Sequence, residues 1–202
     1  MASMNQLKVK DLQILKLPPW SFELSAGESV FLSGPSGSGK TRLLRALADL
    51  DPHQGDMSLD DVSYLGMTAH EWRKKVAFLP AESQWWCVDV GGHFNQYNSD
   101  LLQQLGFSKE TMSWEVARLS SGEKQRLALL RALAENPEVL LLDEPTANLD
   151  DKCTRVIEQV VEGLCRDHGM AAIWVTHNAS QVQRIARHGW VLQGNAIIRQ
   201  DT

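Results

Sequence analysis

Two stretches near the start of the chain alternate between apolar and polar residues. LKVKDLQIL begins at Leu7 and ends shortly before Pro18 and Pro19, and WSFEL begins at Trp20 and leads into a turn that contains glycine. A period of two residues is typical of strands that bury one face, because successive side chains point to opposite faces of a sheet. The two stretches therefore predict antiparallel strands.

Three later stretches are short and apolar almost throughout, which predicts strands buried on both faces. They read SVFLSG from Ser29, VLLLDEP from Val139 and AAIWVTHN from Ala171. A helical pattern, TRLLRALADL, follows the first stretch after a glycine-rich loop, and residues 151–166 give another helical pattern between the other two. Strands of this kind that are separated by helices favour a mainly parallel sheet in an α/β fold.

The remaining segments extend this alternation. DPHQGDMSLDDVSYL contains turn residues and predicts a hairpin, and EWRKKVAFLP predicts the end of a helix followed by a strand. SGEKQRLALLRALAENP has the features of an N-cap, an amphipathic helix and a proline stop. Residues 81–118 have a mixed pattern, which predicts a mostly helical region.

Composition narrows the classes of protein that this pattern allows. The 202 residues, 43% of them hydrophobic, are enough for one substantial core. No run of about 20 apolar residues occurs, and the start, MASMNQLKVK, lacks the apolar segment of a secretory signal, so a cytosolic location is expected. The formal net charge of -5 without a basic block argues against nucleic acid as a partner. Cys87, Cys153 and Cys165 are widely spaced and suit a reducing compartment, so we expect no catalytic role for them.

A glycine-rich loop carries the first chemistry of the chain. GPSGSGKT, from Gly34 to Thr41, fits the pattern G-x-x-x-x-G-K-[ST] and stands between a predicted strand and a predicted helix. Glycines allow backbone N–H groups to surround phosphate oxygens, Lys40 reaches the β- and γ-phosphates, and Thr41 offers a hydroxyl to Mg²⁺. A chance glycine-rich turn is the alternative, and the flanking strand and helix argue against it. The residues expected to hold the nucleotide here are Gly34, Pro35, Ser36, Gly37, Ser38, Gly39, Lys40, Thr41 and Arg42.

Two acids and a histidine follow the later apolar strands. Asp143 ends VLLLD, where its carboxylate is expected to help hold Mg²⁺, and Glu144 comes next, where a carboxylate can orient or deprotonate an attacking water. This pair favours hydrolysis over transfer to a substrate alcohol. His177 follows AAIWVT, where an imidazole can meet the γ-phosphate. A solvated acidic strand end and a structural histidine are the alternatives for these features taken singly.

The order of these motifs resembles that of the ATP-binding cassette (ABC) ATPases. LSSGEKQRLALLRAL, from Leu119, resembles the signature motif of that family, and VLLLDEPTANLD resembles its Walker B strand and D-loop, with the D-loop at residues 147–150. The resemblance extends over residues 7–198. It implies an α/β fold of the P-loop NTPase type, a three-layer sandwich with a mainly parallel sheet, an antiparallel β subdomain and a small helical subdomain. One ABC ATPase domain is expected over residues 1–202, with its core in 1–80 and 119–202 and its helical subdomain in 81–118.

The resemblance also implies roles for single residues and partners for the chain. Lys40, Glu144 and His177 would be catalytic, with Glu144 as the general base, and Thr41 and Asp143 would hold Mg²⁺. In a homodimer that forms on ATP binding, the signature of one subunit would cover the γ-phosphate of the ATP held by the other. The signature residues are Ser120, Ser121, Gly122 and Glu123. A separate membrane-spanning permease would hold the ATPase at the cytoplasmic face of the cell membrane, where hydrolysis would drive transport.

Some positions depart from the family pattern. Ala81 stands where the family has a glutamine that approaches Mg²⁺ and the attacking water, which predicts reduced or differently coupled hydrolysis. Glu82 and Gln84 are the neighbouring side chains that would have to replace that glutamine. Ser121 in place of a glycine and Glu123 in place of a glutamine are milder changes.

Aromatic residues raise two further questions. The family usually has an aromatic residue that stacks on adenine well before the phosphate loop, but here only Leu12 and Leu15 stand in that region, and Trp20 is the nearest aromatic residue. Trp85 and Trp86 follow the strand VAFLP, where the family receives a helix of the membrane subunit. Since adjacent residues point oppositely in extended chain, we expect one tryptophan to be buried and one to be free for a partner.

Other functions were weighed against transport. The alternative is a non-transport ABC ATPase of chromosomes, repair or translation, which would add coiled-coil insertions or a second cassette. A P-loop kinase acting on a small molecule conflicts with the signature motif and with Glu144. Within transporters, GEKQR and WVTH resemble small bacterial cassettes of metal or iron efflux.

Overall fold

The computed structural model describes residues 7–14, 17–147, 149–194 and 196–202. Leu15, one of the residues weighed for adenine contact, and residue 148 of the expected D-loop lie outside these ranges. Within the described ranges, none of the helices combines the length and apolar character that crossing a bilayer requires.

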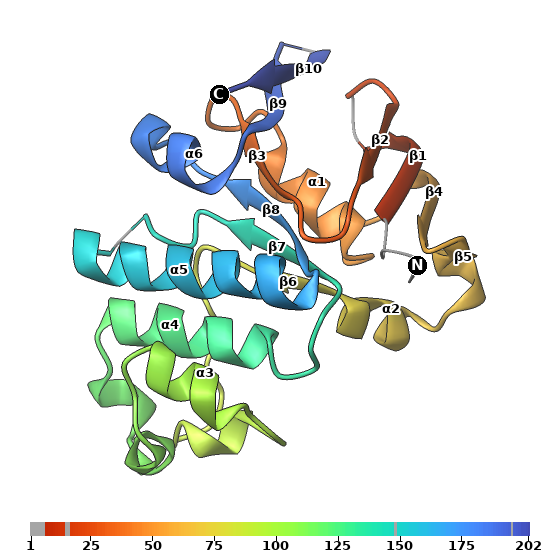
Figure 1. Ribbon diagram of the computed structural model, residues 1–202. Coiled ribbons are helices and arrows are strands. Elements are labelled where there is room, and N and C mark those ends of the chain that lie inside the picture. Colours follow the sequence, from red (N-terminus) through yellow and green to blue (C-terminus); the bar gives the residue numbers. More distant parts are fainter. Residues whose placement is uncertain (1–6, 15–16, 148, 195) are drawn as a thin grey trace.

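Six strands form the central sheet, in the order β10-β9-β3-β8-β7-β6 (Figure 1). Neighbouring strands are parallel except for β9 and β10, which are antiparallel. The predicted mainly parallel sheet is thus confirmed. Its strands are β3 (Ser29–Ser33), β6 (Val76–Leu79), β7 (Val139–Asp143), β8 (Ala171–Val175), β9 (His188–Gln193) and β10 (Ala196–Asp201).

Helices cover both faces of this sheet. One face packs against α1 (Lys40–Leu47), and the other against α4 (Ser121–Ala132) and α5 (Asp151–His168). The shorter helices are α2 (Ala69–Lys75), α3 (Ser99–Gln104) and α6 (Ala179–Ile185). The 3₁₀ turns are η1 (Tyr64–Gly66), η2 (Gly91–His93), η3 (Lys109–Ser113) and η4 (Val116–Arg118).

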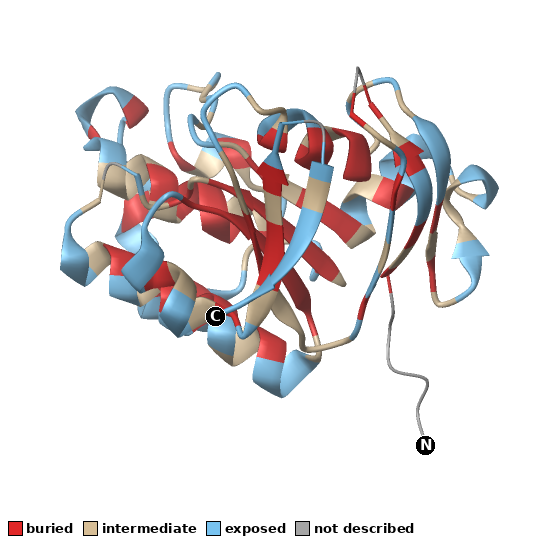
Figure 2. Ribbon diagram, turned by 90° about the horizontal axis from the view of Figure 1, so that it is seen from above, coloured by how far each residue is buried: buried red, intermediate tan, exposed pale blue. Residues whose placement is uncertain are grey.

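Strand β7 shows why the predicted strands are apolar at nearly every position. Val139 and Leu141 pack in the hydrophobic cluster that contains α1, whereas Leu140 and Leu142 pack in the cluster on the opposite face. Figure 2 shows the same distribution, with buried residues concentrated in the central sheet and on the helix faces that contact it. Because both faces are covered by helices, polar side chains are excluded until the strand ends.

A second, antiparallel sheet packs beside these three layers, on the side of α1. It has the order β2-β1-β4-β5, and its inner residues pack in the same cluster as α1. Its strands are β1 (Leu7–Gln13), β2 (Trp20–Leu24), β4 (Gln54–Leu59) and β5 (Val62–Ser63). The antiparallel strands and the hairpin expected from the alternating sequence are confirmed, and with them the three-layer α/β class.

Two regions differ from what the sequence patterns predict. The segment 81–118 contains one α-helix, α3, and several 3₁₀ turns, together with a short antiparallel contact between Asp89 and Glu115. It is therefore less regular than the mostly helical region that was expected. After Asn178 the patterns predicted no element, whereas the structure has α6, β9 and β10.

Gly189 permits the close approach of β9 to β3. A Cβ atom at this position would lie 2.1 Å from the carbonyl oxygen of Phe31, and backbone cannot move aside as a flexible side chain can. Gly163 lies inside α5, and the nearest atom to a Cβ there is 4.0 Å away, on Arg166.

Two glycine-to-alanine variants should therefore change stability in opposite directions. Gly189→Ala should lower the free energy of unfolding by about 1–3 kcal/mol through overpacking. Gly163→Ala should raise it by about 0.5–1 kcal/mol, because alanine loses less entropy than glycine in a helix. Urea denaturation followed by circular dichroism measures both, and a Gly189→Ala variant as stable as the native chain would contradict the packing described.

Candidate active site

The glycine-rich loop connects β3 to α1, and its backbone adopts positive φ angles that favour glycine. Gly34 has φ 143° and Gly39 has φ 101°, values that residues with side chains rarely adopt. A Cβ at Gly34 would also lie 2.6 Å from the carbonyl oxygen of Leu192. Gly39 is the N-cap of α1, so the helix begins at Lys40, and the N–H groups of its first turn have no partner within the helix. The loop therefore ends in a helix N-terminus that suits phosphate.

Lys40 is buried within this loop. Its Nζ donates hydrogen bonds to the carbonyl oxygens of Gly34 and Pro35, both at 2.9 Å. Burial lowers the pKa of Lys40, and the nearby carboxylates of Glu144 and Asp143 oppose that change. The ammonium group is thus held by the loop that is expected to surround phosphate.

Thr41 and Asp143 join α1 to the end of β7. The Thr41 hydroxyl donates a hydrogen bond of 2.8 Å to Oδ2 of Asp143. Burial raises the pKa of the Asp143 carboxyl, and the hydrogen bond from Thr41 acts in the opposite direction. A hydroxyl beside a carboxylate fits Mg²⁺, which takes few protein oxygens and completes its shell with water and phosphate.

Glu144 and His177 face each other beyond the ends of β7 and β8. Nε2 of His177 lies 3.0 Å from Oε1 of Glu144, and both side chains are partly exposed. Glu144 has φ 47°, a left-handed conformation that is uncommon outside glycine, and its N–H donates to the carbonyl oxygen of Val175. The backbone thereby holds the two loops together.

The signature residues begin α4, on the opposite face of the sheet from α1. Ser120 is the N-cap, and the Glu123 carboxylate accepts hydrogen bonds from its backbone N–H and its hydroxyl, both at 2.8 Å. The N–H of Glu123 in turn donates to the Ser120 hydroxyl, which completes a capping box. The hydrogen bond that Glu123 accepts from the Ser120 N–H is the largest cause of a lowered pKa of Glu123, and the bond from the Ser120 hydroxyl adds to it. Ser121 and Gly122 follow in the first turn of the helix.

The structure thus brings together only some of the residues that the sequence predicts to bind and hydrolyse the nucleotide. The loop 34–41, Asp143, Glu144 and His177 lie at the carboxyl ends of neighbouring strands, and Arg42 is an exposed residue of α1. Residues 120–123 begin a helix on the other face.

The segment after β6 places Glu82 near Glu144. Ala81, Glu82 and Glu144 line one cavity of about 250 Å³ together with Ser121. Gln84 is not among the residues that line this cavity, and its carbonyl oxygen accepts a hydrogen bond from Arg131. Of the two neighbours considered for the missing glutamine, Glu82 is therefore the better placed.

Gln125 fixes this segment, and the sequence patterns did not indicate it. The side chain is buried on α4, donates to the carbonyl oxygen of Pro80 and accepts from the hydroxyl of Ser83, both at 3.1 Å. The available signal was a polar residue at a buried position of an amphipathic helix.

Two of the residues considered for adenine contact, Leu12 and Trp20, are not available for it. Leu12 is fully buried, and Trp20 is buried in the same core. Trp20 stacks on Phe22, with ring centroids 4.1 Å apart, and meets the edge of Trp190. Neither side chain has a free face for a base, so the expectation that Leu12 or Trp20 covers adenine is wrong.

Trp85 and Trp86 differ in exposure, although Trp85 is only half-buried and the expectation was a buried residue. Trp85 packs against the hydrophobic cluster of the 81–118 region, whereas Trp86 is 69% exposed. The guanidinium of Arg131 contacts both rings, at 4.7 Å and 4.9 Å from their centroids. Nε2 of His93 accepts hydrogen bonds from the N–H groups of Trp86 and Cys87. The exposed tryptophan is thus held in place by its surroundings.

Comparison with known proteins identifies the family of the chain. A model of the family described as ABC transporter matches residues 17–147. The chain belongs to the ABC transporter family. The order of the motifs in this ABC chain is the one that the sequence resemblance predicted.

Individual relatives of the ABC chain are longer proteins. It is 37% identical over 177 residues to Protein STAR1 of Oryza sativa subsp. japonica, an alignment that covers 81% of this chain and 51% of that protein. It is 34% identical over 179 residues to the aliphatic sulfonates import ATP-binding protein SsuB of Pseudomonas entomophila (strain L48), covering 86% and 66%. The chain thus spans between half and two thirds of the length of these relatives.

A solved structure shares the fold. The dimeric post-hydrolysis state of the ATP-binding cassette MJ0796, bound to ADP and Pi, superposes with a TM-score of 0.79 at 23% sequence identity. The alignment covers 96% of this chain and 98% of that one. At this identity the likeness establishes the fold.

The capping box of α4 generates a pH-dependent prediction. Glu123→Gln should lower stability by about 0.3–1 kcal/mol at pH 7, because it removes a negative charge from a helix N-terminus. The folded chain lowers the pKa of Glu123, so its stabilising effect is full above the pKa of the unfolded chain and is lost as the pH falls through the folded one. Melting temperatures of both proteins should differ at pH 7 and converge towards pH 3. A constant difference over that range would contradict this role.

Proposed function

We propose that the chain is the ATP-binding and ATP-hydrolysing subunit of an ABC membrane transporter. The observation that carries the proposal is the meeting of a phosphate-binding loop with the Thr41–Asp143 and Glu144–His177 pairs at one edge of the sheet. Phosphate binding alone would fit many P-loop proteins. A second carboxylate beside a histidine, next to the phosphate-binding loop, favours hydrolysis. Membership of the ABC family supports ATP as the nucleotide.

In this proposal each side chain has a separate task. Lys40 shifts from the carbonyl oxygens of its own loop to the β- and γ-phosphate oxygens, whose negative charge it offsets. Glu144 orients the attacking water and accepts its proton, and Nε2–H of His177 donates to the γ-phosphate. Glu144 and His177 must separate before they can contact the water and the γ-phosphate. Because both side chains are partly exposed, they can move apart.

Thr41 and Asp143 would hold Mg²⁺. The ion would supply charge neutralisation between the β- and γ-phosphates when bound. The protein's part is to keep the Thr41 hydroxyl and the buried Asp143 carboxylate next to each other.

The signature residues imply a second subunit. The N-terminus of α4 can bind an anion, but it lies on the opposite face of the sheet from the phosphate loop. A head-to-tail homodimer would place residues 120–123 of one copy over the ATP of the other, so that ATP itself joins the subunits. The Glu123 carboxylate would then have to release the Ser120 hydroxyl to the γ-phosphate.

A separate permease is the proposed membrane partner, and it would hold the ATPase at the cytoplasmic face of the membrane. The surface of this chain on which the permease would dock consists of Trp86, Val88 and Trp114, which are 69%, 76% and 41% exposed. Backbone hydrogen bonds between segments 88–90 and 114–116 hold Val88 and Trp114 on adjacent segments. Exposed Asp89 and Glu115 flank this surface; Glu115 is paired with Arg118, and Asp89 complements the Lys- and Arg-rich cytoplasmic segments of membrane proteins. We therefore propose a cytoplasmic helix of the permease as its occupant.

The division into one ABC domain with a core of residues 1–80 and 119–202 and a helical part of 81–118 is included in this proposal. The metal- or iron-efflux subtype stays a prediction from the wording of GEKQR and WVTH.

Replacing Glu144 should separate hydrolysis from binding. Glu144→Gln should lower kcat for ATP by about 100-fold or more, the usual contribution of a general base, with little change in ATP affinity. Phosphate release and fluorescent-nucleotide titration measure the two quantities. Glu135→Gln, which makes the same substitution in a surface ion pair with Lys74, is the matched control. A Glu144→Gln chain that hydrolyses ATP at the native rate would refute the proposed role.

Replacing Trp86 should weaken binding of the permease without changing ATP binding. Trp86→Ala should weaken binding to the permease by at least about 10-fold, because exposed aromatic anchors dominate such interfaces, while ATP affinity stays unchanged. Leu65→Ala serves as the control, since Leu65 is also strongly exposed, at 76%, but lies in η1. Co-purification and titration with the permease in detergent would measure this. Normal assembly of the Trp86→Ala chain would exclude this surface.

A further inference from the structure

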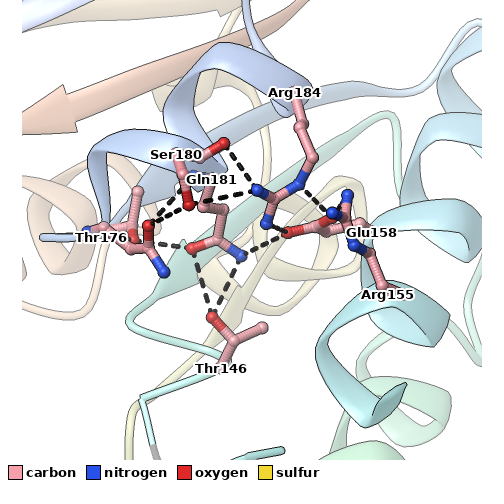
Figure 3. A network of polar contacts seen from close by, with 8 residues as sticks. Thr146, Arg155, Glu158, Thr176, Ser180, Gln181 and Arg184 are labelled. Atoms are coloured by element: carbon pink, nitrogen blue, oxygen red, sulfur yellow. Dashed lines mark hydrogen bonds and ion pairs between the residues drawn. The ribbon is translucent and has the colours of Figure 1, made fainter. Parts of the chain in front are cut away.

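A buried glutamine connects the loop that carries His177 to the loop that follows Glu144. Gln181 belongs to α6 and has no exposed surface. Its Oε1 accepts a hydrogen bond of 2.7 Å from the hydroxyl of Thr176, the residue before His177. Its side chain also contacts the hydroxyl of Thr146, which lies two residues after Glu144, at 3.1 Å and 3.2 Å (Figure 3).

The orientation of the amide follows from its third partner. Nε2 of Gln181 donates a hydrogen bond of 3.0 Å to Oε1 of Glu158 on α5. An ionised carboxylate can only accept, so the amide nitrogen must face Glu158 and the amide oxygen must face Thr176. The Glu158 carboxylate thus sets the direction of the amide, and the Thr176 hydroxyl, which can donate or accept, donates to it.

The carboxylate of Glu158 is itself fixed. Arg184 forms a two-point ion pair with it, with Nη2–Oε1 at 2.7 Å and Nε–Oε2 at 3.0 Å, and Arg155 approaches Oε2 at 3.4 Å. The hydrogen bond with Glu158 raises the pKa of Arg184. In Figure 3 the guanidinium of Arg184 lies beside the Gln181 amide at the Glu158 carboxylate, and Arg155 lies on the other side of that carboxylate. The buried acceptor that orients Gln181 is therefore paired with cations on α5 and α6.

The turn that carries His177 is held on both sides. Thr176 also accepts a hydrogen bond from the N–H of Asn178, and Oδ1 of Asn178 accepts one from the N–H of Gln181. Since His177 lies between Thr176 and Asn178, its backbone is fixed relative to α6 by the same glutamine. The imidazole itself is exposed and depends on that backbone for its place opposite Glu144.

We propose that Gln181 is a positioning residue that keeps His177 aligned with Glu144, through hydrogen bonds to Thr176 and Thr146 whose direction Glu158 sets. The inference rests on the proposed ATPase function for its link to catalysis. Gln181 is buried away from the nucleotide-binding loop and does not touch the reacting atoms. It should therefore influence kcat and leave ATP affinity unchanged.

An exchange of donor and acceptor tests this assignment. Gln181→Glu keeps the size of the side chain but places a carboxylate against Glu158. At pH 8.5 this variant should show kcat lowered by about 10- to 100-fold, the scale of a small misplacement of a catalytic group, with ATP affinity unchanged. The double variant Gln181→Glu with Glu158→Gln restores a donor facing an acceptor. It should recover part of the lost kcat, because two carboxylates no longer face each other, whereas the two-point ion pair with Arg184 is not restored.

A matched control and a second readout complete the experiment. Gln183→Glu adds the same charge at an exposed position of the same helix and should behave as the native chain. The ¹⁵N chemical shifts of the His177 imidazole, assigned by their loss in His177→Ala, should move in Gln181→Glu and return in the double variant. This readout needs no hydrolysis, so it separates the inference from the proposed function.

The outcomes are distinct. If the native chain hydrolyses no ATP but the His177 signals respond as described, the proposed function fails and the positioning role stands. A folded Gln181→Glu chain with native His177 shifts and native kcat overturns the inference. A folded double variant that recovers neither quantity also overturns it, because loss of packing rather than of pairing would then explain the single variant.

Discussion

Burial of the central sheet on both faces is the constraint on which the rest of the structure depends. Polar side chains are excluded from the middle of β3, β7 and β8, and they appear where these strands end. The strands are parallel neighbours in register, with Val175 opposite both Leu32 and Asp143. The phosphate loop, the acid pair and His177 consequently reach the same edge although they are far apart in the sequence. This is the usual position of ligand sites in open α/β sheets.

The same constraint decides how much the sequence could predict. Fully apolar runs that end in GPSGSGKT, DEP and THN indicated both the parallel sheet and the residues at its edge. Side-chain partners were not predictable, because Gln125 and Gln181 are single polar residues at buried helix positions, and their role depends on which carbonyl or carboxylate packs against them. The region 81–118 was also predicted less well, since 3₁₀ turns and short bridges leave no clear period. Trp20 was ambiguous for a similar reason: an aromatic residue on a strand suits a core and a binding face equally.

Departures from the family pattern occur at the places where two loops or two subunits would meet. Glu123 engages the hydroxyl of Ser120, and Ala81 leaves Glu82 beside Glu144 in a small cavity. Glu123 places a carboxylate where the family has a neutral amide, whereas Ala81 has no polar side chain at the position of the family's glutamine. At Gln181 and Glu158, by contrast, an amide donates to a carboxylate, and two arginines pair with that carboxylate.

The central claim is that one copy of the chain holds only part of the catalytic site. Sedimentation velocity of the Glu144→Gln chain, with and without saturating ATP, tests it most directly. We expect a monomer without nucleotide and a dimer with ATP, which reverts to monomer when Gly122→Arg blocks the N-terminus of α4. A chain that stays monomeric when ATP is bound, or that dimerises equally without it, would contradict the account.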